Sequence, residues 1–211
     1  MADNYLEKQF DKAFGTKKVV KHIGHTLDEL LTKNRSTRGY DKNFVVTRDR
    51  LEKIVTVAQK CPSGRNQQVL RFRLVTKDSG ADKVLPLIKM GAALPELHLP
   101  FPGTEPESFI VVCSTKAPDP MVYFDLGIVS QSILLRATEM GLNGLIMAAF
   151  NKAKITEVLA LPYEPVAVIA IGKSIEKFRL KEIGEGDSHS YYREEDGTHV
   201  VPKLGLKDLI I

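Results

Sequence analysis

Cysteine is scarce in this chain, with two residues among 211. Cys61 and Cys113 lie far apart and form no C-x-x-C pair, so the sequence predicts neither a zinc site nor a redox disulfide. Cys113 ends the apolar run 109–113, where it is expected to pack as a small hydrophobic residue. No cysteine chemistry is therefore indicated.

Charge of one sign and long apolar runs are also lacking. The 30 basic and 26 acidic residues leave a net charge of only +4. Nucleic-acid-binding proteins usually concentrate basic residues with interleaved aromatics. The nearest candidate for such a cluster is Lys17, Lys18, Lys21 and His22, and a solvated helix face explains these residues equally well. No run is long enough to span a bilayer, and the first residues lack a signal-peptide pattern. We expect a cytoplasmic protein without nucleic-acid or membrane partners.

Helical and strand patterns alternate through the first half of the chain. Thr26 and Glu29 form a capping box that opens a short helix ending near Asn34. Leu51, Ile54, Val55 and Ala58 recur at helical spacing. These and neighbouring patterns predict helices at 48–60 and 79–90, with a half-buried strand at 70–74 between them.

The second half holds the most apolar segments. Residues 121–140 are apolar almost all round, which predicts a helix buried on every side, and a subunit interface would explain this. The other expected elements are a central strand at 109–113, a strand with a small-residue loop at 142–150, a helix at 152–160, a strand at 166–171 and a hairpin at 189–201 turning at Asp196-Gly197. Together they predict α+β layers around one sheet: a helical arm at 1–25 and one domain at 26–211.

Two polar segments flank the helix expected at 48–60. Residues 34–41 contain Arg35, Ser36 and Arg38. The forked guanidinium donors of the arginines and the serine hydroxyl suit a phosphate or an anionic heterocycle. A surface ion-pair cluster with nearby Asp41 or Asp49 explains the two arginines equally well. Residues 61–68 gather amides and small residues, as in a solvated turn or a ligand loop. The pair suits a ligand with an anionic tail and a flat, polar-edged ring.

Side-chain catalysis finds little support. Ser63 has no identifiable histidine partner, and no carboxylate pair has acid–base spacing. His22 and His25 stand at HxxH spacing without a third ligand, so no metal site is expected. If the protein is an enzyme, we expect a cofactor to carry the chemistry and no side chain to be catalytic.

At these motifs the chain resembles the nitroreductase family. Asn34-Arg35-Ser36-Thr37-Arg38 is similar to the family's R-R-S-x-R stretch, and Pro62-Ser63-Gly64-Arg65-Asn66-Gln67-Gln68-Val69-Leu70 to its P-S-x-x-N-x-Q-P-W, with Val69-Leu70 in place of Pro-Trp. Asp125, Gly127 and Gln131 match a D-x-G…Q pattern. The resemblance runs over about 26–211 in the right order.

The resemblance implies an α+β fold of three α/β/α layers with a central mixed, mainly antiparallel sheet. It also implies a homodimer with FMN at the subunit interface and NAD(P)H as co-substrate. Arg179 competes with Lys203 for the phosphate. The implied cofactor-binding residues are Arg35, Ser36 and Arg38; Pro62, Ser63, Gly64 and Asn66 from the partner; the loop Met147-Ala148-Ala149 against the ring; and Lys203 at the phosphate.

The implied activity is hydride transfer from NAD(P)H to a nitroaromatic, quinone or similar small-molecule acceptor by a ping-pong mechanism. Two alternatives stay open. One is a flavin-processing or dehalogenating relative on the same fold, and the other is a non-enzymatic dimeric binding module.

Overall fold

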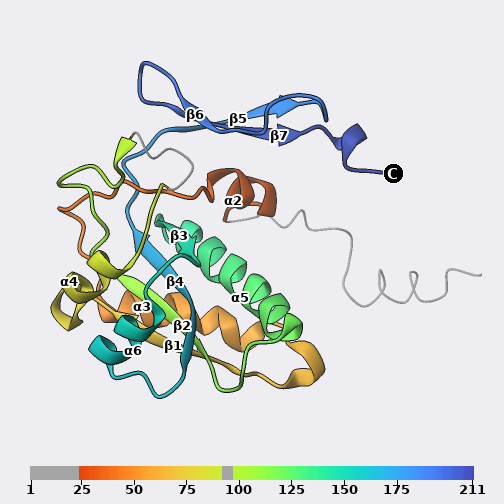
Figure 1. Cartoon of the computed structure of the whole chain (residues 1–211). Helices are drawn as coiled ribbons and strands as arrows, with labels where there is room; N and C mark the ends of the chain where they lie inside the picture. Colours follow the sequence, from red (N-terminus) through yellow and green to blue (C-terminus); the bar gives the residue numbers. More distant parts are fainter. Residues whose placement is uncertain (1–23, 92–96) are drawn as a thin grey trace, which may run out of the picture.

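The fold is a four-stranded sheet between two helical layers, with a smaller sheet beside it (Figure 1). The computed structural model describes residues 24–91 and 97–211. Most of the N-terminal arm expected at 1–25 lies outside these ranges. The described helices are α2 (Leu27–Lys33), α3 (Arg48–Val55), α4 (Ala81–Val84), α5 (Pro120–Glu139) and α6 (Lys152–Leu159).

The central sheet has the strand order β1-β2-β4-β3, and every neighbouring pair is antiparallel. Its strands are β1 (Leu70–Val75), β2 (Phe109–Ser114), β3 (Asn143–Met147) and β4 (Glu164–Gly172). All six residues of β2 are buried, as are eight of the nine in β4. The prediction of a continuous apolar run as a central strand is therefore confirmed.

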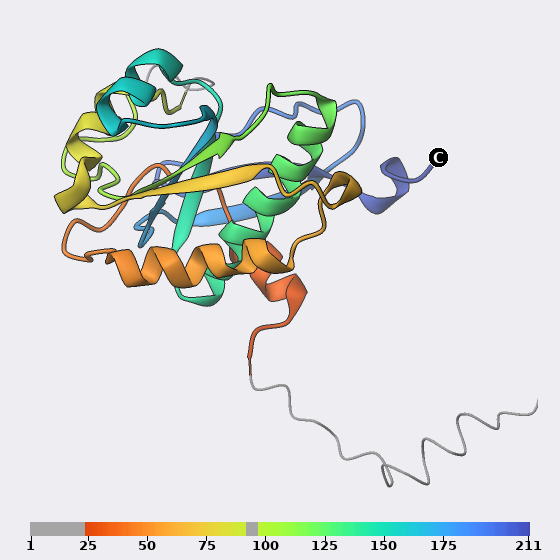
Figure 2. The same ribbon diagram turned by 90° about the horizontal axis from the view of Figure 1, so that it is seen from below.

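Alternate side chains of the central strands enter two separate cores. Ile110, Val112 and Ile169 pack with apolar residues of α3 and α5. Val111 and Val168 face the opposite way, toward α4 and α6. Because successive strand residues point to opposite faces, one apolar run supplies both cores. Figure 2 shows α3 and α5 on one side of the sheet and α4 and α6 on the other, which confirms the three-layer α/β/α prediction.

Two predicted helices are shorter in the structure. The helix expected at 48–60 ends at Val55 and continues as a 3₁₀ turn over Thr56–Lys60, a common way to finish an α-helix. The helix expected at 79–90 is reduced to α4 and a 3₁₀ turn at Leu85–Leu87. Pro86 has no backbone N–H and so cannot continue the α-helical hydrogen bonding.

The C-terminal region forms a second sheet of three strands in the order β5-β7-β6. β6 (Tyr192–Arg193) and β7 (His199–Leu204) pair antiparallel, and Gly197 turns between them with φ 80°. This confirms the hairpin predicted at 189–201. The parallel partner β5 (Phe178–Ile183) was not predicted from the sequence. The sheet lies over α2 (Figure 1).

Helix α5 has one buried and one exposed apolar face. Asp119 caps it by accepting a hydrogen bond from the Val122 amide, and Pro120 occupies its first turn. The helix packs on the sheet, yet Tyr123 and Phe124 are 53% and 67% exposed. The composition of the helix predicted burial on every side. Within one chain, one side of the helix is exposed instead. No described helix combines the length and apolar character needed to cross a membrane.

Removing a core side chain from β4 should destabilise the whole fold. Ile169 is fully buried, so Ile169→Ala is expected to lower the free energy of unfolding by about 2–5 kcal/mol, as measured by urea denaturation. The control Ile175→Ala changes a side chain that is 54% exposed and should cost less than about 1 kcal/mol. Equal losses in the two variants would contradict the placement of the core.

Candidate functional site

The segment after α2 is held against the edge of the central sheet. The Thr37 amide donates a hydrogen bond to the Gly144 carbonyl at 3.2 Å, and Ser36 forms a parallel bridge with Gly144. A Cβ at position 144 would lie 2.3 Å from the Ala170 carbonyl oxygen, so glycine is needed at this close approach. The backbone of the segment that carries Arg35, Ser36 and Arg38 is thus fixed at the sheet edge.

Glu176 ties this segment to the C-terminal sheet. Its carboxylate accepts hydrogen bonds from the Arg38 amide at 2.6 Å, the Thr37 hydroxyl at 2.8 Å and the Arg193 guanidinium. The side chain is 6% exposed. Burial acts to raise the pKa of Glu176, but these hydrogen bonds and the charge of Arg193 bring it below its ordinary value. Glu176 is therefore an ionised, buried link between the two parts of the chain.

A pocket of about 300 Å³ lies between the segment and the C-terminal sheet. Arg35, Ser36 and Arg38 contribute one wall, and Lys203 on β7 contributes to the other. Four of the predicted site residues, far apart in sequence, therefore line a single pocket. Its remaining lining residues come from the end of α2, from α5, from β3 and from the C-terminal sheet: Asn34, Gln131, Leu134, Ile146, Phe178, Tyr191, His199 and Val201.

The two arginines of the pocket lack carboxylate partners within the described ranges 24–91 and 97–211. The Nε atoms of Arg35 and Arg38 are buried without a hydrogen-bond partner in this part of the chain. Burial lowers the pKa of Arg35. Asp41 pairs with Lys173 at 3.7 Å instead. The ion-pair explanation of these arginines is thus not what the structure shows, and the pocket presents uncompensated positive charge, which favours an anion.

The two basic residues considered for a phosphate lie in different surroundings. Lys203 lines the pocket, whereas Arg179 forms an ion pair with Glu194 of the hairpin and does not line it. The geometry therefore favours Lys203 over Arg179 as a ligand of an anion in this pocket.

Aromatic rings form the part of the pocket wall contributed by the C-terminal sheet. The His199 ring lies 5.5 Å from Phe178 and 5.0 Å from Tyr191, and the Arg38 guanidinium lies 5.3 Å from the Tyr191 ring centroid. Burial, followed by the charge of Arg193, lowers the pKa of His199, so its ring is neutral at pH 7. The wall thus adds a flat apolar surface to the cationic one.

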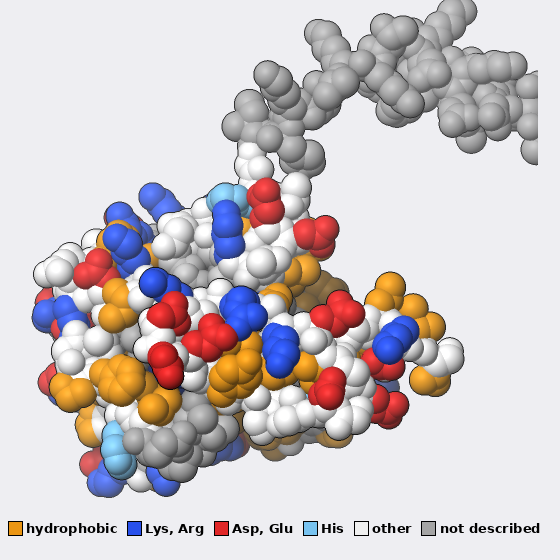
Figure 3. Space-filling view, turned by 90° about the horizontal axis from the view of Figure 1, so that it is seen from above, with side chains coloured by type: hydrophobic (Ala, Val, Ile, Leu, Met, Phe, Trp, Pro, Cys, Tyr) orange, Lys and Arg blue, Asp and Glu red, His pale blue; other side chains and the backbone are white. Residues whose placement is uncertain are grey.

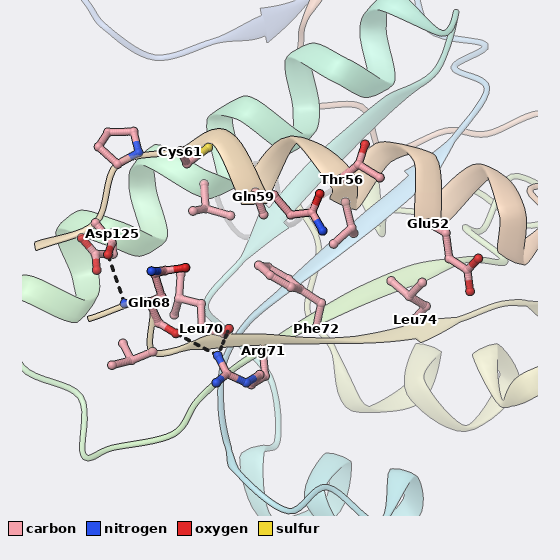
Figure 4. A pocket seen from close by; sticks show the side chains of 16 residues that line it. Glu52, Thr56, Gln59, Cys61, Gln68, Leu70, Arg71, Phe72, Leu74 and Asp125 are labelled. Carbon is pink, nitrogen blue, oxygen red and sulfur yellow. Dashed lines mark hydrogen bonds between the residues drawn. The ribbon is translucent and has the colours of Figure 1, made fainter. Parts of the chain in front are cut away.

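The second predicted segment lies elsewhere in the same chain. Pro62 and Ser63 line a separate groove of about 400 Å³ between α3 and β1 (Figure 4). Leu70 and Phe72 face this groove from the strand. Gly64 and Asn66 form a tight turn beside it and do not line the first pocket. The two predicted halves of the site are therefore not brought together within one chain.

The predicted loop after β3 is divided between core and surface. Met147 is buried in the core toward α4 and α6, and Ala148 is exposed. The Ala149 carbonyl accepts a hydrogen bond from the Lys89 amide at 3.0 Å and lines a different pocket. Ile146 precedes Met147 and lies on the opposite face of β3, where it lines the pocket that contains Arg35, Arg38 and Lys203, which we call the cationic pocket.

A scan against protein-family models matches the model of the nitroreductase family over residues 31–173. The chain belongs to this family. The matched region holds the central sheet and its helices, and the C-terminal sheet with Lys203 lies beyond it. No curated protein matches the chain.

Solved structures of the same fold agree with this assignment. A nitroreductase family protein of Clostridium difficile is 25% identical, with a TM-score of 0.57, and the match covers 72% of this chain and 86% of that one. A candidate nitroreductase of Exiguobacterium sibiricum, solved in complex with FMN, is 20% identical, with a TM-score of 0.58 and coverage of 72% and 90%. A candidate NAD(P)H:FMN oxidoreductase of Staphylococcus epidermidis is also 20% identical, with a TM-score of 0.58 and coverage of 72% and 88%.

Several residues of the site could not be found from the sequence. Neither Glu176 nor Arg193 carries a local signal in the sequence that points to a site, and His199 lies in a strand of the predicted hairpin. Only the fold of the C-terminal sheet makes them neighbours of Arg38. No local spacing signal identifies them.

The lowered pKa of Glu176 predicts a pH-dependent stability. A carboxyl whose pKa is lower in the folded state contributes stability above its ordinary value of 4.5, and this contribution disappears as pH falls through the folded-state pKa. In Glu176→Gln we expect a free energy of unfolding lower by about 2 kcal/mol at pH 7 and a shallower decline below 4.5. Denaturant titrations at a series of pH values measure both.

The control for this experiment is Glu52→Gln. Glu52 pairs with Arg48 on the surface of α3, where its side chain is 51% exposed. Its replacement should leave the pH profile of stability unchanged, since exposed pairs contribute little. An identical pH profile in Glu176→Gln and the wild type would contradict the role given to Glu176.

Proposed function

We propose that this protein is a homodimeric, FMN-dependent oxidoreductase that uses NAD(P)H to reduce nitroaromatic, quinone or similar acceptors by a ping-pong mechanism. The observation that carries the proposal is the pocket in which Arg35, Arg38 and Lys203 meet beside aromatic rings. Membership of the nitroreductase family and the FMN in a structure of the same fold support it.

The pocket residues fit the anionic part of FMN. The buried, unpartnered Nε atoms of Arg35 and Arg38 are donors that a phosphate or an anionic ring edge would satisfy. The Ser36 side chain adds a hydroxyl and Lys203 a third cation. On the face carrying the C-terminal sheet, the described basic and acidic side chains are interspersed (Figure 3), so a phosphate would meet concentrated positive charge in the pocket and not across that surface.

The second half of the site requires a partner. Met121, Tyr123, Phe124 and Ile128 form an exposed apolar face on α5, which we call the α5 face. Soluble monomers rarely expose so many neighbouring large apolar side chains. Burial of the α5 face against a second copy would allow Pro62, Ser63, Gly64 and Asn66 to complete the site of the other subunit, as the family resemblance implies.

The chain itself supplies binding and orientation. Cationic side chains fix the anionic tail, and the aromatic wall and Ile146 exclude water from one side of the pocket. When bound, FMN supplies the hydride-carrying chemistry between NAD(P)H and the acceptor. No acid–base side chain needs to be assigned. A flavin-processing or dehalogenating enzyme of the same fold would not turn over NAD(P)H with a quinone, so that assay separates the two possibilities.

Lys203 and Arg179 provide a matched test of cofactor binding. We expect the wild type to bind FMN with a yellow absorbance that NAD(P)H bleaches. Lys203→Ala should raise the Kd for FMN by about 10- to 100-fold, because it removes a charged hydrogen-bond donor, whereas Arg179→Ala should leave it unchanged. Flavin fluorescence titration measures both constants. A wild type that takes up no FMN overturns the proposal.

Charge placed on the α5 face should separate the subunits. Phe124→Asp introduces a carboxylate at a residue that is 67% exposed in one chain, so the monomer should fold normally while the dimer loses affinity. Analytical ultracentrifugation should show a monomer, and FMN binding should fall with it. The control Tyr163→Asp alters an exposed aromatic residue outside α5 and should remain dimeric.

A further inference from the structure

A buried carboxylate of α5 holds the loop 62–68. Asp125 is 3% exposed, and one of its oxygens, Oδ1, accepts a hydrogen bond from the Gly64 amide at 2.8 Å. Figure 4 shows this bond reaching from the helix to the loop at one end of the groove. A carboxylate removed from water and bound to a backbone amide makes a strong contact, because the bond is charge-assisted.

The loop adopts a backbone shape that needs such support. Arg65, Asn66 and Gln68 have positive φ angles of 52°, 54° and 49°, although none is glycine. Side chains disfavour this left-handed conformation, so it persists only where surrounding contacts impose it. Within the loop, the Gln68 amide donates to the Ser63 hydroxyl at 3.1 Å.

Helix α5 and Lys116, which precedes it, each supply a further contact to the same loop. A Cβ at position 64 would lie 2.3 Å from the Met121 sulfur, so the loop packs directly on the first turn of the helix and a larger residue there would displace the Met121 side chain. Lys116, just before the helix, donates to the Gln67 side chain at 3.0 Å and pairs with Asp119 at 2.9 Å. The loop is thus held by α5 at Gly64 and by Lys116 at Gln67.

Asp125 also adjoins the α5 face. Phe124 precedes it in the helix, and Ile128 follows one turn later on the exposed side. A single rigid helix therefore carries both the exposed apolar side chains and the carboxylate that holds the loop. Whatever packs against the α5 face is placed at a fixed position relative to Ser63 and Asn66.

We propose that Asp125 is a positioning residue, whose hydrogen bond to the Gly64 amide fixes the loop in the shape in which Ser63 and Asn66 contact FMN held by the partner subunit. This inference rests on the proposed function and deepens it. In this proposal Asp125 acts by holding the loop and not by contact with the cofactor. Its effect reaches the flavin through the loop, and the α5 helix sets where the loop stands.

The test compares three substitutions on α5. Asp125→Ala removes the acceptor and should raise the Kd for FMN by about tenfold, the effect of losing one buried hydrogen bond. Asp125→Asn keeps a neutral acceptor and should raise it by about threefold. The control Ser130→Ala changes a side chain that is 1% exposed, and its hydroxyl makes no hydrogen bond among the described residues. It should leave the Kd unchanged.

Hydrogen–deuterium exchange of the peptide containing Gly64, measured without FMN, supplies a readout that is independent of the flavin. Exchange should be faster in Asp125→Ala, intermediate in Asp125→Asn and unchanged in Ser130→Ala, and ultracentrifugation should show dimers throughout. If the alanine variant does not fold, the asparagine variant carries the same comparison.

The outcomes are distinguishable. A wild type that binds no FMN overturns the proposed function and the role of Asp125 together. A wild type that binds FMN, with an Asp125 variant whose Gly64 exchange is faster but whose Kd is unchanged, overturns the positioning role alone. Unaltered exchange in the Asp125 variants overturns it as well, since the carboxylate would then not hold the loop.

Discussion

Strands β2 and β4 are apolar on both faces, and the rest of the architecture follows because each face must be covered by its own layer of helices. Ile110 and Val111 are adjacent in sequence, yet each is fully buried in a different core. A sheet with two apolar faces cannot leave either one in water, so α3 and α5 cover one side and α4 and α6 the other. The sheet edge and the helix ends are then the places left for a site.

The same requirement explains the unusual composition of α5. One side of the helix must match the sheet, whereas Tyr123 and Phe124 on the other side stay more than half exposed within one chain. An apolar surface of this kind gains free energy when a partner removes it from water. Its position in the helix that also holds the loop 62–68 would link assembly of the proposed dimer to the geometry of the proposed flavin site.

The cationic pocket depends on a different interaction, the buried carboxylate of Glu176. Three donors from two distant parts of the chain converge on it, and with them the segment carrying Arg35 and Arg38 is fixed opposite Lys203. Glu176 accepts a hydrogen bond from the backbone amide of Arg38, and the Arg38 side chain lines the pocket. The buried ion pair of Glu176 and Arg193 thus stabilises the fold, whereas Arg35, Arg38 and Lys203 supply the positive charge of the pocket.

The sequence by itself determined the fold class, the central strands and the hairpin, because apolar periodicity and turn residues are local properties of the chain. It also determined the family, because the order of the family's motifs can be read directly from the sequence. It also singled out Arg35, Ser36, Arg38 and Lys203, although Arg179 remained an equal choice for the phosphate. Only the tertiary structure placed Lys203 in the pocket and Arg179 outside it, shortened two helices and revealed Glu176, His199 and the Asp125–Gly64 bond. These depend on contacts between segments remote in the chain, and such contacts leave no trace in local spacing.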